Sequence, residues 1–146
     1  MKTTIARLFP IAAIAAVTIA ATQLHAAPVP ELTVAVPFDF VVSGKTMPAG
    51  TYRVSLVTTQ SGIPSFIVRN QSTRIGAFAV MGGRAVNSKP LDGGAQVAFS
   101  CRAETCYWRE IRVPGRDAYV APLPSITRGQ HEKMVALDAR FAATGR

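Results

Sequence analysis

The amino-acid sequence predicts a mainly β protein: a small antiparallel sandwich or barrel of about six strands, followed by a C-terminal α-helix. Three observations support this fold class. Short apolar segments alternate with a period of two, glycine and proline separate these segments, and 49% of the 146 residues are hydrophobic while only 16% are charged. A chain with this composition has enough apolar surface for a core and is unlike a disordered protein or a coiled coil.

The first residues have the three-part layout of a secretory signal peptide. Lys2 and Arg7 form a basic start, and an uncharged, mostly apolar run follows from Leu8 to Ala21. Small residues surround the expected cleavage point, which follows Ala26 or Ala27. A membrane-spanning helix needs about 20 apolar residues, so this run is too short to be an anchor.

These features divide the chain into two parts. We expect a signal peptide over residues 1–26 and a single β-rich domain over residues 27–146. The mature chain contains no second long apolar run, so we expect no transmembrane segment in it. An exported protein, either periplasmic or secreted, is therefore the expected product.

The first strand is expected from Thr33 to Val42. Every second residue from Val34 to Val42 is apolar, which is typical of a half-buried strand. Pro37 lacks a backbone N–H, so we expect the strand to lie at a sheet edge or to bend there. The segment from Ser43 to Gly50 then contains the glycine and proline residues of a turn.

Three further strands are expected in the middle of the chain. The segments Thr51–Val57 and Ser65–Arg69 alternate between apolar and polar residues, which predicts one buried face for each. The segment Ile75–Met81 is almost entirely apolar. Because a strand that is buried on both faces has this pattern, we expect it to be central in the sheet.

The last pair of strands, Ala95–Cys101 and Cys106–Val113, predicts a hairpin closed by a disulfide. Cys101 and Cys106 are the only cysteines, and an exported protein meets an oxidising compartment. If the two strands pair around the four intervening residues, the two cysteines face each other at disulfide distance.

The C-terminal segment predicts a helix over about residues 127–142. Thr127 and Gln130 have the spacing of a capping box. The apolar residues that follow lie near one stripe of a helix: Met134, Val135, Leu137 and Phe141.

The charge of the mature chain bears on its partners. Removal of Lys2 and Arg7 leaves 14 basic and 8 acidic residues, a formal charge of +6. A basic surface attracts anionic sugars, phospholipid head groups or nucleic acid. The arginines are scattered singly and do not alternate with aromatic residues, which favours a solubilising surface and weak binding to anionic polymers. We therefore expect envelope components or anionic glycans as partners and no specific nucleic-acid binding.

Two short motifs suggest chemistry but are incomplete. Gly44 to Thr46 matches the end of a phosphate-binding loop, but Asp39 occupies the position where that loop begins with glycine. His131 and Glu132 begin a zinc motif whose second histidine is Val135 here. The sequence therefore predicts no catalytic residue, no metal site and no cofactor.

Acidic residues leave one enzymatic alternative open. Four carboxylates, if they met in the fold, would suit a small carboxylate-dependent extracytoplasmic hydrolase: Asp39, Glu104, Glu110 and Asp117. The interpretation that we favour is a non-enzymatic binding or structural module of the cell envelope or secretome.

The segment from Val36 to Ser55 resembles the opening of a family of small exported, β-rich bacterial proteins. The shared features are the strand V-P-F-x-F, the turn G-K-x-x-P-A-G and a second strand that begins with Tyr52. The late hairpin from Phe99 to Ile111 is similar to that of the family, but Ala103 occupies a position where the family has glycine. The family has no known activity, so the resemblance implies an exported β fold and no catalytic residues.

Overall fold

The computed structural model describes residues 31–85, 91, 93–125 and 129–142, which form one sheet of eleven strands and contain no α-helix. The strands are β1 (Glu31–Val36), β2 (Phe40–Val42), β3 (Lys45–Met47), β4 (Gly50–Thr58), β5 (Pro64–Asn70), β6 (Gly76–Val80), β7 (Gly83–Ala85), β8 (Ala95–Arg102), β9 (Thr105–Arg112), β10 (Ala118–Val120) and β11 (Glu132–Phe141). The mainly β class is confirmed, whereas the count of about six strands and the C-terminal helix are wrong. The expected signal peptide, with its cleavage at Ala26 or Ala27, lies outside the described residues.

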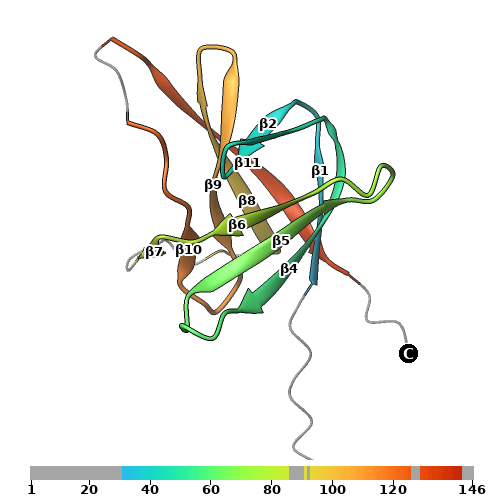
Figure 1. The fold of residues 1–146 in the computed structure, drawn as a ribbon. Helices are drawn as coiled ribbons and strands as arrows, with labels where there is room; N and C mark the ends of the chain where they lie inside the picture. The colour runs from blue at the N-terminus through green and yellow to red at the C-terminus, as the bar shows by residue number, and fades with distance from the viewer. Residues whose placement is uncertain (1–30, 86–90, 92, 126–128, 143–146) are drawn as a thin grey trace, which may run out of the picture.

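The sheet curls into a nearly closed, barrel-like arrangement. Its hydrogen-bonded order is β3-β2-β9-β8-β11-β1-β4-β5-β6, and β10 pairs with both β7 and β9. Figure 1 shows β4, β5 and β6 crossing in front of β8, β9 and β11. The two ends of the order approach each other, and the Lys45 Nζ donates a hydrogen bond across this seam to the Gly76 carbonyl oxygen at 2.7 Å.

The first predicted strand is two strands separated by a bend. β1 pairs with β4 and β11, whereas β2 pairs with β3 and β9, so the chain changes partners between Val36 and Phe40. The bend contains Pro37, as the sequence predicts, because proline cannot donate a ladder hydrogen bond. Burial keeps its period of two through the bend, with Val34, Val36 and Phe40 all at most 2% exposed.

The predicted turn from Ser43 to Gly50 contains an additional short strand. β3 pairs antiparallel with β2 through a two-residue turn in which Ser43 and Gly44 both have positive φ angles, 47° and 82°. Paired positive φ values suit the right-handed twist of a tight hairpin. The turn motif is therefore a hairpin loop with no helix after it, unlike a phosphate-binding loop.

β4 and β5 confirm the predicted alternation. Tyr52 and Val54 on β4 and Phe66 and Val68 on β5 are at most 3% exposed, whereas Arg53 and Arg69 between and beside them are exposed. The aromatic rings meet in the interior: the ring centroid of Phe40 lies 5.0 Å from that of Tyr52 and 5.2 Å from that of Phe99. Edge-to-face contacts of this kind stabilise a core beyond the area that they bury.

β6 is not the central strand that its apolar sequence predicts. It ends the hydrogen-bonded order and forms a ladder only with β5. Its inward face consists of Ala77 and Ala79, whereas Phe78 and Val80 are 45% and 42% exposed. The apolar run of β6 therefore combines small residues that face inward with large apolar residues that face solvent. Periodicity alone does not distinguish this arrangement from a strand that is buried on both faces.

The C-terminal segment is a strand because two other strands offer it their edges. β11 pairs with β8 over eight residues and with β1 over three. Val135, Leu137 and Ala139 alternate toward the interior, and Ala139 is only 3% exposed. These long-range ladders override the helical preference of the local sequence. The predicted capping residue Thr127 lies outside the described residues.

Candidate anion-binding site

The candidate site is built on the turn that joins β5 to β6. Asn70 is 3% exposed, and its Oδ1 accepts hydrogen bonds from the backbone N–H groups of Ser72 and Thr73 at 2.9 and 3.0 Å. Its carbonyl oxygen accepts the N–H of Arg74 at 3.1 Å. A Cβ on Gly50 would lie 2.6 Å from the Asn70 side chain, so glycine is required there for Asn70 to pack. Asn70 thus fixes the turn that carries Arg74.

Two more arginines lie on the outer face of the adjoining strands. Arg53 on β4 and Arg69 on β5 are direct cross-strand partners. Like charges that face each other on antiparallel strands are destabilising. A negative charge beside this pair reduces the repulsion, and Glu31 provides one next to Arg53.

These arginines surround an open cavity of about 590 Å³. Its lining residues are Glu31, Arg53, Ser55, Ile67, Arg69, Asn70, Gln71 and Arg74. Among the described residues, three arginines therefore share the cavity with a single carboxylate. The sequence alone does not reveal this grouping, because the three arginines are separated in the chain and only the β4–β5 register and the β5–β6 turn bring them together.

The one carboxylate does not neutralise the cavity. Glu31 Oε1 accepts a hydrogen bond from Ser55 Oγ at 2.8 Å, and Glu31 Oε2 lies 3.6 Å from Arg53 Nε. Within the described residues, neither Arg69 nor Arg74 has an ion pair. Guanidinium groups bind phosphate, sulfate and carboxylate through two parallel hydrogen bonds, so the arrangement can hold an anionic group.

Arg74 has an unusual backbone conformation for a side chain of its size. Its φ angle is 59°, in the left-handed region that glycine or asparagine normally occupies. Arg74 lies in the hairpin loop between β5 and β6, which a backbone hydrogen bond from Asn70 to Ile75 closes at 2.8 Å. Hairpin loops commonly contain a residue in this conformation, so the loop fixes the position of Arg74 beside the cavity.

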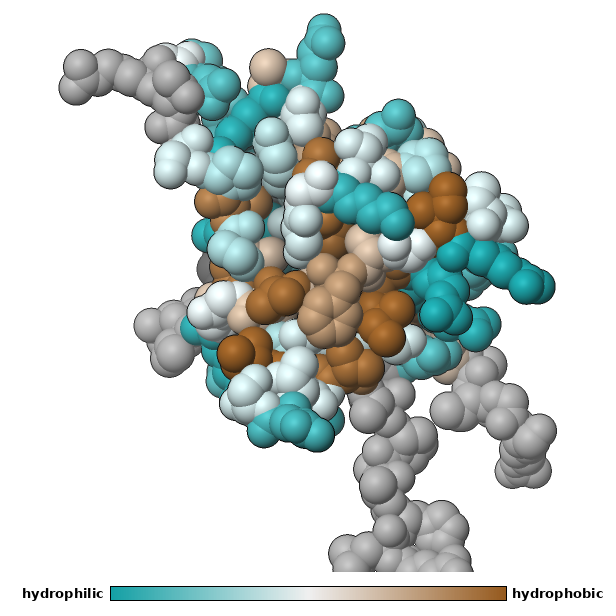
Figure 2. Space-filling view, viewed as in Figure 1, coloured by the Kyte–Doolittle hydropathy of each residue, from teal (hydrophilic) through white to brown (hydrophobic). Residues whose placement is uncertain are grey.

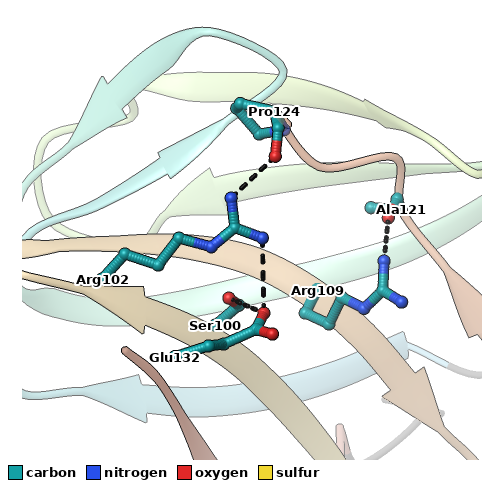
Figure 3. A network of polar contacts seen from close by, with 6 residues as sticks. All are labelled: Ser100, Arg102, Arg109, Ala121, Pro124 and Glu132. Carbon is teal, nitrogen blue, oxygen red and sulfur yellow. Dashed lines mark hydrogen bonds and ion pairs between the residues drawn. The ribbon is translucent and has the colours of Figure 1, made fainter. Parts of the chain in front are cut away.

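A separate polar network lies on the β8–β9 hairpin (Figure 3). Arg102 is 7% exposed, and its Nη1 donates to the carbonyl oxygen of Pro124 at 2.6 Å while its Nη2 lies 3.4 Å from Glu132 Oε1. Ser100 Oγ also donates to the Glu132 carboxylate. Arg109 Nη1 donates to the Ala121 carbonyl oxygen at 3.0 Å, so two arginines hold the segment after β10 against the hairpin.

The charges of this network serve to hold the segment after β10 in place. The hydrogen bond from Ser100, together with Arg102, lowers the pKa of the Glu132 carboxyl from its ordinary value of 4.5, although desolvation opposes the shift. A carboxylate with a lowered pKa is a poor general base near neutral pH. The Ser100 hydroxyl donates a hydrogen bond to this carboxylate, and the network drawn in Figure 3 contains no histidine.

None of the four carboxylates of the enzymatic alternative lines a described cavity, and two of them, Glu104 and Asp117, are exposed. Asp39 Oδ1 accepts the N–H of Ala49 at 2.8 Å, which holds the turn before β4. Glu110 forms a two-pronged ion pair with Arg112 at 2.8 and 3.0 Å and thereby raises the pKa of that arginine. Three cavities in the described part of the chain are each lined by no more than one carboxylate.

The remaining predicted site residues are easily placed. Cys101 and Cys106 face each other across the hairpin, with their sulfur atoms 2.03 Å apart and their Cα atoms 3.9 Å apart. Phe99 faces Trp108 across the same hairpin, and a bulge interrupts the register between Ala98 and Phe99. His131 is exposed just before β11.

A second cavity, of about 430 Å³, is mainly apolar and lies between the β2–β3 turn and the segment Ala121–Pro124. Within the described ranges, no three histidine, cysteine or acidic side chains gather closely enough to hold a metal ion. None of the structure that is described includes a helix long and apolar enough to cross a membrane. Comparisons of the chain with protein-family models, with curated proteins and with solved structures found no match.

Proposed function

We propose that the protein is an exported, non-enzymatic binding module that captures an anionic component of the cell envelope at the cavity formed by Arg53, Arg69 and Arg74. One observation carries this proposal: within the part of the chain that the structure describes, three arginines line one cavity with a single carboxylate, and two of these arginines have no ion pair. The ligand class is a molecule that carries phosphate, sulfate or carboxylate groups, because these groups match the guanidinium donors.

Export supports the choice of an envelope ligand. The N-terminal residues have the layout of a signal peptide, and the two cysteines lie at disulfide distance, which suits an oxidising compartment. N-terminal sequencing of the exported protein tests this part of the proposal. We expect Ala27 or Pro28 as the first residue, and a chain that still begins at Met1 contradicts it.

The binding proposal is tested by calorimetric titration of the mature protein with a heparin hexasaccharide as a soluble polyanion. The double variant Arg53→Gln/Arg69→Gln is expected to bind about tenfold more weakly at low salt, which corresponds to roughly 1.4 kcal/mol. Exposed charges interact weakly and are screened by salt, so the affinity of the wild type should fall as salt is added.

The matched control is Arg116→Gln/Lys133→Gln, which removes the same charge from exposed positions that do not line the cavity. This control is expected to bind within a factor of about two of the wild type, because loss of net charge alone acts weakly through screened solvent. Equal weakening of both double variants would show that binding depends on net charge and has no defined site.

A further inference from the structure

The outer face of β4, β5 and β6 changes from charged to apolar along the strands. The register places Arg53 opposite Arg69, and the next row on the same face places Ile67 opposite Phe78. The row after that contains Val80 on β6, opposite Ser65. Successive rows on one face are two residues, or roughly 7 Å, apart. The arginines and the apolar side chains therefore lie on one continuous surface.

The apolar rows are open to solvent. Phe78 and Val80 are 45% and 42% exposed, and Ile63, in the turn that precedes β5, is 44% exposed. Figure 2 shows hydrophobic side chains, coloured brown, gathered over the region where Figure 1 places β5 and β6, with hydrophilic side chains in teal beside them. Exposed apolar patches beside polar residues mark surfaces that bind a partner.

Ile67 joins the two features. It lines the arginine cavity and is also the cross-strand partner of Phe78, so a ligand in the cavity lies directly beside the apolar rows. Lys45 adds a further positive charge near this surface, since its Nζ reaches the Gly76 carbonyl oxygen on β6. The surface therefore combines positive charge with apolar side chains at adjacent positions.

We infer that this face docks on an anionic lipid bilayer. The arginines contact the phosphates of the headgroups, while Phe78 and Val80 enter the boundary between headgroups and acyl chains. This inference rests on the proposed anion site and specifies its ligand as a phospholipid headgroup. Proteins that bind at a membrane surface combine these two contributions, apolar burial of about 5–10 Å and attraction of basic residues to anionic lipid.

The apolar rows favour lipid over a sulfated or carboxylated polysaccharide. A polyanionic sugar chain satisfies the arginines but offers no apolar surface to cover Phe78 and Val80. A bilayer supplies both chemistries within the spacing of two or three strand rows. The charge on the protein is complementary to an anionic surface, because the cavity holds three guanidinium groups and one carboxylate.

The test is co-sedimentation of the mature protein with vesicles of phosphatidylglycerol and phosphatidylcholine, and separately with vesicles of phosphatidylcholine alone. We expect binding to the anionic vesicles only. The variant Phe78→Ser/Val80→Ser is expected to lose at least tenfold in vesicle affinity and to bind the heparin hexasaccharide as the wild type does. Retained hexasaccharide binding also shows that this variant is folded.

The matched control is Met134→Ser/Phe141→Ser, which changes two side chains on β11 that are each 49% exposed. It should bind anionic vesicles as the wild type does. If the wild type binds the hexasaccharide but not the anionic vesicles, or if Phe78→Ser/Val80→Ser binds them normally, the inference is wrong and the anion site stands. If the wild type binds neither the hexasaccharide nor the anionic vesicles, both proposals are wrong.

The alternative role of this face is the association of two copies of the chain. If the mature protein sediments as a dimer and Phe78→Ser/Val80→Ser sediments as a monomer, while neither binds vesicles, the face joins two copies of the chain and the lipid inference is overturned.

Discussion

Among the residues that the structure describes, three other than glycine have left-handed backbone conformations: Ser43, Arg74 and Ala103. Ser43 and Ala103 lie in two-residue hairpin turns, where a positive φ is demanded by the twist of the strands. Arg74 also lies in a hairpin loop, between β5 and β6, and in addition it lines the candidate site. The left-handed conformation thus serves a turn at all three positions, and at Arg74 the turn also carries a cationic side chain of the site.

Glycine substitution separates these two roles. A left-handed conformation costs a residue with a Cβ about 1–2 kcal/mol, and substitution by glycine removes this cost. The greater freedom of glycine in the unfolded chain offsets about 0.4–1 kcal/mol of the stability that is gained in this way. Arg74→Gly should therefore raise the free energy of unfolding by roughly 0.5–1 kcal/mol while it weakens hexasaccharide binding. Ala103→Gly is the control and should stabilise to a similar extent with unchanged binding, as measured by urea unfolding and calorimetry.

Glu132 makes the stability of the folded protein depend on pH in the acidic range. Folding lowers the pKa of its carboxyl below the ordinary 4.5, through Ser100 and Arg102, so the ionised form is stabilised in the folded state. This contribution is complete well above pH 4.5 and is lost as the pH falls through the lowered pKa. The stability difference between the wild type and Glu132→Gln should therefore shrink below pH 4.5 in urea unfolding series. A difference that stays constant into acid contradicts the assigned pKa shift.

The link between Cys101 and Cys106 closes a short loop. Closing so few residues removes little entropy from the unfolded chain, so the double variant Cys101→Ser/Cys106→Ser is expected to lose about 2 kcal/mol and to remain folded. Thiol titration of the denatured, unreduced mature protein provides the companion measurement. We expect no free thiol, and two per chain contradict the disulfide.

At the scale of single elements, the sequence predicts strands well where alternate residues bury against near neighbours. Tyr52 and Val54 on β4, and Phe66 and Val68 on β5, all face the interior as the alternation predicts. The same reasoning fails where the partner is distant in sequence. β11 has helix-forming residues, and only the free edges of β8 and β1 make it a strand.

The strand assignment of β11 has a direct test. Ala139 faces the interior at 3% exposure, whereas Ala136 on the same strand is exposed. Ala139→Asp buries an unpaired carboxylate and should lower the free energy of unfolding by at least 3 kcal/mol. Ala136→Asp should stay within about 0.5 kcal/mol of the wild type, as exposed substitutions do. Similar effects of the two substitutions contradict the inward direction of Ala139.

At the scale of the whole molecule, the curled sheet determines which residues share a surface. Arg53, Arg69 and Arg74 gather because β4 and β5 pair in one register and the following turn folds back beside them. The sequence predicts the basic charge and the strands but not this grouping, because a one-residue change of register moves a side chain to the other face. The exposure of Phe78 is likewise not predictable from the sequence, because this residue lies in a continuous run of apolar residues.

The central claim is that anions bind at the cavity formed by Arg53, Arg69 and Arg74. The most direct measurement is an NMR titration of the ¹⁵N-labelled mature protein with the heparin hexasaccharide at low salt, in which backbone amide and arginine Nε shifts are followed. The account predicts that the largest shifts occur at these three arginines and in the β5–β6 turn. Shifts spread evenly over the basic residues of the chain, or centred on the apolar cavity beside Trp108, would contradict it.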